Sequence, residues 1–277
     1  MPPGLRTAQS ISLTAPRMLT VMVMTRRRRW QKEVEVLREV AAVARQGWLI
    51  PQPSPTLKQH GDARHLVVFV HGIFASSGVF RPMAFALARE GLAPRQVNFD
   101  YTPVGTIERH AKRLCAVIAD ARVPGPVIVV AHSLGGLIVR HAVQHLGLHV
   151  DALVTMGTPH HGTSLARPWP WRLAQELSPG SVAIASLAAT SHRLKRTAVT
   201  SVIAEQDVLV EASSASLSGS RLVRVPGVGH HGVLYDPLAW SAVRDAIRSV
   251  TEAPSDGGRS SGEFVLGPDG TVRDRAG

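Results

Sequence analysis

Residues 127–140, Val-Ile-Val-Val-Ala-His-Ser-Leu-Gly-Gly-Leu-Ile-Val-Arg, decide the fold of this chain. Their run of β-branched residues predicts a buried strand, and an apolar pattern with helical spacing begins directly after Ser133. A strand, a serine and a helix in immediate succession predict a nucleophile elbow, a tight turn that strains the backbone of its serine. The residues two before and two after that serine must be small, and Ala131 and Gly135 meet this condition. Ser133 is therefore the candidate nucleophile.

The rest of the chain alternates short apolar strands with helices, which is typical of an α/β protein with a mostly parallel, doubly wound sheet. The expected strands are residues 66–70, 96–101, 127–131, 151–156, 199–204 and 221–225, and the expected helices are residues 81–90, 106–121, 134–146 and 237–250.

Residues 158–196 interrupt this alternation, because the segment is too long for a connection and is rich in Pro, Trp, Ala and Leu. We interpret it as a short helical cap inserted into the domain. Its large apolar side chains must be covered, since leaving each in water costs roughly 1.5 to 3 kcal/mol. Two roles remain open: a fixed helical layer packed on the domain, or a surface that partly lines an apolar acyl pocket above Ser133.

We expect one α/β domain over residues 62–252, flanked by two weakly structured ends. Residues 1–55 are predicted to be disordered apart from an amphipathic helix and a Pro-rich linker, and residues 253–277 to form a disordered tail. The single cysteine, Cys115, excludes an internal disulfide and has the helical spacing of a small core residue.

The formal net charge of the chain is +11, and residues 1–50 contribute 9 − 3 = +6 of it. This distribution favours a basic tail over a basic groove, and no nucleic-acid-binding motif is present. No run of 18 apolar residues predicts a spanning helix, and the charges follow the short apolar segment near the N-terminus instead of preceding it as in a signal peptide. We expect a cytoplasmic or peripherally membrane-associated protein, with a candidate membrane contact formed by Arg26, Arg27, Arg28, Arg29 and Trp30.

A serine hydroxyl becomes a useful nucleophile only when an imidazole takes its proton, and a carboxylate must orient that imidazole. In a sheet of this kind the acid and then the histidine follow the serine, each on a loop after a later strand. Asp207 follows the strand at 199–204 directly, whereas Glu205 is a weaker candidate and Asp236 falls after the histidines. The glycine-rich loop at 227–232 supplies two histidines, His230 and His231, of which one is the expected base.

An oxyanion forms during acyl transfer, and preorganised backbone N–H groups must stabilise it. One expected donor is the amide of Leu134, directly after the serine. The second is the amide of Ile73 in the His71-Gly72 turn after the first strand. We expect His71 to brace this loop and to take no part in proton transfer.

Four motifs carry a family resemblance: Val-His-Gly-Ile at 70–73, Ala-His-Ser-Leu-Gly-Gly at 131–136, Met-Gly-Thr-Pro-His-His-Gly-Thr at 156–163 and Gly-Val-Gly-His-His-Gly-Val-Leu at 227–234. With them the chain from about residue 66 to 250 resembles the bacterial lipase and esterase group of the α/β-hydrolases. The third motif is also similar to a stretch of larger lipases and of glycosylphosphatidylinositol deacylases. The resemblance implies an α/β-hydrolase fold and selects His230 as the histidine of the triad.

These observations predict a serine hydrolase that cleaves carboxylic esters through an acyl-enzyme, with Ser133, His230 and Asp207 as its triad. The chemistry requires no cofactor, and the adjacent His160 and His161 are not expected to share a metal ion. A small ester or lipid is the expected partner. The alternatives are an acyltransferase with the same triad and a non-catalytic binding protein on the same fold.

Overall fold

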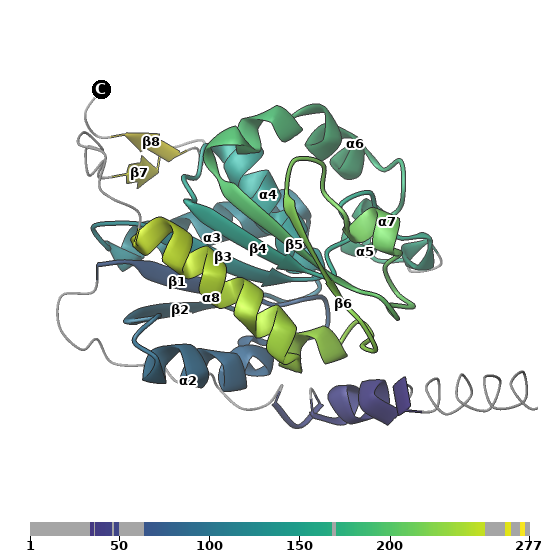
Figure 1. Cartoon of the computed structure of the whole chain (residues 1–277). Helices are drawn as coiled ribbons and strands as arrows, with labels where there is room; N and C mark the ends of the chain where they lie inside the picture. Colours follow the sequence, from purple (N-terminus) through teal and green to yellow (C-terminus); the bar gives the residue numbers. More distant parts are fainter. Residues whose placement is uncertain are drawn as a thin grey trace, which may run out of the picture.

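The computed structural model of the chain describes residues 34–35, 37–45, 47–49, 64–167, 170–252, 264–266 and 272–274. At its centre lies a six-stranded sheet in which all neighbouring strands are parallel, in the order β2-β1-β3-β4-β5-β6 (Figure 1). Its strands are β1 (Leu66–Val70), β2 (Arg95–Phe99), β3 (Val127–His132), β4 (Ala152–Met156), β5 (Ala198–Ala204) and β6 (Arg221–Val225). Each overlaps a predicted strand, with ends that differ by at most two residues, so the predicted α/β sheet is confirmed.

Helices cover both faces of this sheet (Figure 1). One core contains side chains from α3, α4 and α6, and the other contains side chains from α2 and α8. The α-helices are α2 (Arg81–Arg89), α3 (Ile107–Ala121), α4 (Leu134–Leu146), α5 (Arg172–Glu176), α6 (Val182–Ala189), α7 (Ala212–Ala215) and α8 (Pro237–Thr251), and the 3-10 helices are η1 (Ser77–Phe80), η2 (Ser164–Ala166), η3 (Ser191–Arg196) and η4 (Gly232–Tyr235).

Strand β1 shows why the central strands are apolar throughout. Val67 and Phe69 belong to the core beneath α2 and α8, whereas Val68 and Val70 belong to the core beneath α3 and α4. Successive side chains of a strand point to opposite faces, so a strand covered on both sides needs apolar residues at every position.

The sheet order places β1 and β3 side by side, and the chain leaves β1 toward β2 on one side and β3 toward β4 on the other. Sites in such sheets form at this reversal, beyond the carboxyl ends of the strands.

The predicted cap between β4 and β5 forms a helical layer packed on the domain. Its apolar side chains at Leu173, Leu177, Ile184 and Leu187 are buried in the same core as α3 and α4. Trp171 is 44% exposed, and Trp169 lies outside the described residues. These four side chains therefore belong to a fixed helical layer, which is the first of the two roles considered for the inserted segment.

A buried arginine fastens this layer to the helix that follows Ser133. Arg140 of α4 donates to the carbonyl of Leu187 at 2.8 Å and to the carbonyl of His160 at 3.2 Å. Gln144, one turn along α4, donates to the same Leu187 carbonyl at 2.8 Å. Burial lowers the pKa of Arg140 to about 10, so the guanidinium stays charged at neutral pH. These bonds hold α6 against α4.

Near the termini, the structure describes helical residues from 34 to 49, with residues 36 and 46 left out. The predictions of disorder over residues 1–33 and of a linker at 51–55, with the basic residues Arg26 to Arg29 and Trp30, fall outside the described residues. In the C-terminal tail, β7 (Phe264–Leu266) and β8 (Val272–Asp274) pair antiparallel. The expectation of a tail without regular structure therefore does not hold for these six residues.

Two further observations concern predictions made from composition. Cys115 is part of α3 and its side chain is buried in the core, as its helical spacing predicts. Burial raises the pKa of its thiol to about 12. Within the described part of the chain, no helix has both the length and the apolar character needed to cross a membrane.

Candidate active site

Ser133 lies between β3 and α4 in a backbone conformation that is rare for a residue with a side chain. Its φ is 53° and its ψ is −127°. Such a strained conformation persists only where the surrounding structure holds it. The Ser133 amide donates to the carbonyl of Met156 on β4 at 2.9 Å, and its carbonyl accepts from Gly136 at 3.1 Å. The strand, the strained serine and the helix are the elbow that the sequence predicts.

Glycines allow the neighbouring backbone to approach this turn. A Cβ atom at Gly135 would lie 2.4 Å from the carbonyl oxygen of Val70 and 2.6 Å from that of His71. No side chain fits there without moving β1 away from α4. At Gly72 a Cβ atom would lie 2.9 Å from the Cβ atom of Ser133. The turn after β1 therefore lies directly against the serine, as the prediction for Ile73 requires.

Asp207 and His230 form a buried pair on the loops after β5 and β6. His230 Nδ1 donates to Asp207 Oδ2 at 2.7 Å, and both side chains are at most 5% exposed. The other carboxylate oxygen of Asp207 accepts from the amides of Leu209 and Val210, each at 2.8 Å. This arrangement fixes the tautomer of His230 with its proton on Nδ1, so that Nε2 is left as the acceptor.

The other candidates for these roles have different contacts. His231 Nδ1 donates to Glu39 Oε1 at 2.9 Å, away from Asp207. Asp236 caps α8, because its Oδ1 accepts from the Leu238 amide at 2.8 Å. Glu205 is exposed. Of the weighed acids and histidines, the structure brings together Asp207 and His230.

Gly157 connects this pair to the serine, and its position was not predicted. A Cβ atom there would lie 3.1 Å from His230 Nδ1 and 3.2 Å from Asp207 Oδ2, and its φ is +54°. The residue before it, Met156, accepts the hydrogen bond from the Ser133 amide. Ser133 and the Asp207–His230 pair thus lie at the same edge of the sheet. The Met-Gly-Thr-Pro motif marks this glycine in the sequence, although its spacing does not reveal what the glycine faces.

His132, directly before the serine, supports the histidine loop. Its Nε2 donates to the carbonyl of His230 at 2.9 Å, and the two rings lie 4.7 Å apart. Complete burial lowers the pKa of His132 well below its usual value, so this ring stays neutral. The elbow and the histidine loop are therefore joined by a direct hydrogen bond.

His71 braces the turn that carries Ile73. Its Nδ1 donates to the carbonyl of Gly72 at 2.7 Å, and its Nε2 accepts from the Tyr101 amide at 3.2 Å. The Tyr101 hydroxyl in turn donates to the His71 carbonyl at 2.8 Å, and the two rings stack 4.3 Å apart. Burial lowers the pKa of His71, which keeps it neutral. The amides of Ile73 and Leu134 are thus carried by backbone that flanks Ser133 on two sides.

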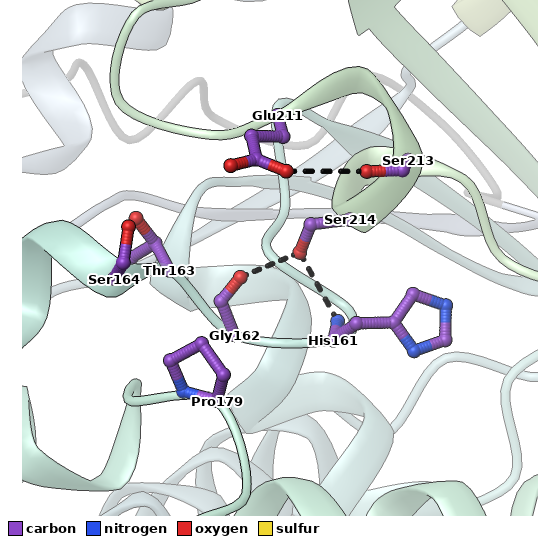
Figure 2. Close-up of a pocket in the computed structure, with 8 residues that line it drawn as sticks. All are labelled: His161, Gly162, Thr163, Ser164, Pro179, Glu211, Ser213 and Ser214. Carbon is purple, nitrogen blue, oxygen red and sulfur yellow. Dashed lines mark hydrogen bonds between the residues drawn. The ribbon is translucent and has the colours of Figure 1, made fainter.

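A pocket of about 310 Å³ lies beside the acid loop (Figure 2). Its lining includes Ser214, whose Oγ donates to the carbonyl of Gly162 at 2.6 Å and accepts from the His161 amide at 3.2 Å. Thr163 Oγ1, also in the wall, donates to the carbonyl of Leu209 at 2.6 Å, which joins the pocket to the loop held by Asp207.

The two adjacent histidines of the third motif face different surroundings. His160 is buried, with Nε2 3.1 Å from Thr155 Oγ1 and Nδ1 3.3 Å from Arg140 Nη1. His161 Nε2 donates to the carbonyl of Ser216 at 3.2 Å. Among the described residues no group of three or more His, Cys, Asp or Glu could hold a metal ion.

Solved structures with the same arrangement of strands and helices include three bacterial proteins. The mature lipase BlEst2 of Bacillus licheniformis is 17% identical and covers 70% of this chain and 95% of its own, with a TM-score of 0.57. The product of gene lin2722 from Listeria innocua is 14% identical, covers 66% and 94%, and has a TM-score of 0.52. An alpha/beta hydrolase fold protein from Burkholderia ambifaria is 18% identical, covers 70% and 91%, and has a TM-score of 0.50.

At these identities the likeness concerns the fold alone, and it confirms the predicted α/β-hydrolase fold. Residues 35–221 match the family model described as Domain of unknown function (DUF7379). This match takes in more than half of the chain, which therefore belongs to that family. The matched region begins within the helical segment at 34–49.

Proposed function

We propose that this protein is a serine hydrolase that cleaves carboxylic esters through an acyl-enzyme. The observation that carries the proposal is the buried hydrogen bond between His230 and Asp207, at the sheet edge where Ser133 occupies a strained elbow. An orienting carboxylate and an imidazole with a free Nε2 are what a serine hydroxyl needs to become nucleophilic.

In this mechanism Ser133 Oγ attacks the ester carbonyl carbon while His230 Nε2 takes the hydroxyl proton. The amides of Ile73 and Leu134 stabilise the oxyanion, and His230 then gives its proton to the departing alcohol. Water then resolves the acyl-enzyme: His230 Nε2 takes a proton from the attacking water and returns it to Ser133 Oγ as the acid departs. Each proton moves between groups of this chain, substrate and water, so the reaction needs no cofactor.

The acyl group meets a partly apolar surface beside the oxyanion turn. Phe74, one residue after Ile73, contacts Trp171 edge to face with ring centroids 5.2 Å apart, and both rings are partly exposed. The four large apolar side chains of the inserted segment named above are buried in the core. We infer that Phe74 and Trp171 supply apolar contacts for uncharged acyl chains, and that kcat/KM rises from acetyl to medium chains, because each buried methylene contributes up to about 0.8 kcal/mol.

The test is hydrolysis of p-nitrophenyl esters of graded chain length by the purified full chain, with mass spectrometry of the acid-quenched protein. The proposal expects turnover of uncharged esters and an acyl adduct on the peptide that contains Ser133. Adding an alcohol separates hydrolysis from transfer to that alcohol. Absence of turnover and of adduct across the series would sink the proposal, whereas a steady fall from acetyl onward would limit it to short-chain esters.

A further inference from the structure

A glutamate from the N-terminal helical segment contacts the histidine loop. Glu39 is half-buried, and its Oε1 accepts from the His231 amide and from His231 Nδ1, both at 2.9 Å. Its Oε2 accepts from the Gly232 amide at 3.1 Å. Hydrogen bonds to an ionised carboxylate are about twice as strong as those between neutral groups. This carboxylate lies 192 residues before the loop that it holds.

These contacts complete the support of a single peptide group. The peptide between His230 and His231 offers a carbonyl and an amide, and His132 donates to the carbonyl at 2.9 Å while Glu39 accepts from the amide at 2.9 Å. With both polar groups bonded, the plane of the peptide is fixed, and so is the direction in which the His230 ring leaves the backbone. Asp207 then fixes the rotation of the ring itself.

Glu39 also satisfies the start of η4. The first amides of a helix lack partners within it, and the residue that precedes η4, His231, supplies no capping bond from its side chain. The Glu39 carboxylate takes the amides of His231 and Gly232 in its place. Burial by itself raises the pKa of this carboxyl, but the hydrogen bonds from His231 and Gly232 outweigh it and lower that pKa.

The glycines of the loop fit this contact. A Cβ atom at Gly229 would lie 2.5 Å from Glu39 Oε2, so a side chain there would displace the carboxylate. Arg45, further along the same helical segment, lies over the ring of Tyr235 with its guanidinium carbon 4.5 Å from the centroid. The helical segment therefore contacts η4 through Arg45, and its Glu39 binds the residue next to His230.

From this geometry we propose that Glu39 is a positioning residue for His230, and that the helical segment at 34–49 is part of the catalytic unit. The inference rests on the proposed serine hydrolase. It goes beyond the triad because it assigns to Glu39 and His231 the task of fixing the peptide from which the base projects.

The test compares Glu39→Ala and Glu39→Gln with two matched controls in the full chain. Glu35→Ala removes an acid one turn earlier in the helical segment, and Arg45→Ala removes the contact with Tyr235 while leaving Glu39 in place. We expect Glu39→Ala to lower kcat roughly 10- to 100-fold with little change in KM, because small misplacements of a catalytic group cost about that much. The kcat of Glu39→Gln should lie between those of the wild type and Glu39→Ala, since the one amide oxygen can accept only some of the three hydrogen bonds.

Two readouts separate positioning from a general loss of structure. Added acetate should restore part of the kcat of Glu39→Ala by supplying a carboxylate, and should leave the wild type unchanged. Hydrogen exchange of the peptide that spans His231 and Gly232 should be faster in Glu39→Ala and unchanged in Glu35→Ala. A wild-type kcat in Glu39→Ala would overturn the inference. It would also be overturned if Arg45→Ala lowered kcat as much as Glu39→Ala does and acetate restored none of the kcat of Glu39→Ala. A wild-type protein that no fluorophosphonate labels at Ser133 would instead overturn the proposed function.

Discussion

Ser133 is held by residues that adjoin it in the chain or in the next strand, whereas His230 is held by residues from three distant segments. The elbow needs β3, α4, the Met156 carbonyl and the absence of a side chain at Gly135. The proposed base, His230, is bound by Asp207 at its ring and by His132 at its carbonyl, and Glu39 binds the amide of the next residue. The proposed nucleophile is thus held by the sheet itself, while the proposed base depends on contacts that single substitutions can remove one at a time.

Breaking the contact at the His230 ring should have the largest effect on turnover. Asp207→Asn should lower kcat by roughly 10⁴-fold while the protein stays folded, because an amide favours the wrong imidazole tautomer. Steady-state kinetics with a p-nitrophenyl ester, together with circular dichroism, check both parts. Glu205→Gln is the matched control and should keep most of the activity. If the control loses the activity and Asp207→Asn keeps it, the acid has been misassigned.

Damage to the elbow should appear first as lost stability. Gly135→Ala should lower the free energy of unfolding by about 1 to 3 kcal/mol or more, because the new Cβ atom would overlap the carbonyls of Val70 and His71. Gly47→Ala is the control, since a Cβ atom at this helical glycine meets nothing within 4 Å and alanine favours a helix by roughly 1 kcal/mol. Urea unfolding measures both variants. Equal stability of Gly135→Ala and wild type would show that β1 and α4 can move apart freely.

His132, which joins the elbow to the histidine loop, should have a smaller effect on stability, and this effect depends on pH. Burial lowers the pKa of His132, so below about pH 6.5 the unfolded chain takes up a proton that the folded protein refuses. Stability should therefore fall as the pH drops below that value, by up to about 1.4 kcal/mol per pH unit for this group. His132→Gln should reduce this slope, and His192→Gln, which replaces an exposed histidine, is the matched control. Unfolding curves at pH 7, 6 and 5 decide it, and an unchanged slope in His132→Gln would mean that the ring is protonated in the folded protein.

The same difference explains what could be predicted from the sequence. Local sequence patterns indicate the strands, the elbow and the order of acid and histidine. Ser133, Asp207 and His230 could therefore be selected from spacing and resemblance. The partner of His231 could not, because nothing in the local sequence links Glu39 to a loop 192 residues later. The inserted segment shows a similar limit. Its apolar residues predicted a covered surface, but the buried bonds from Arg140 that fix it to α4 depend on tertiary packing.

The most direct test of the proposed triad is labelling by a fluorophosphonate, which reacts rapidly with a serine when the base of that serine is in place. The account predicts that the wild type is labelled at Ser133, that Ser133→Ala is not labelled, and that His230→Ala reacts far more slowly although its serine is intact. Labelling that survives in Ser133→Ala, or equal rates in wild type and His230→Ala, would contradict it.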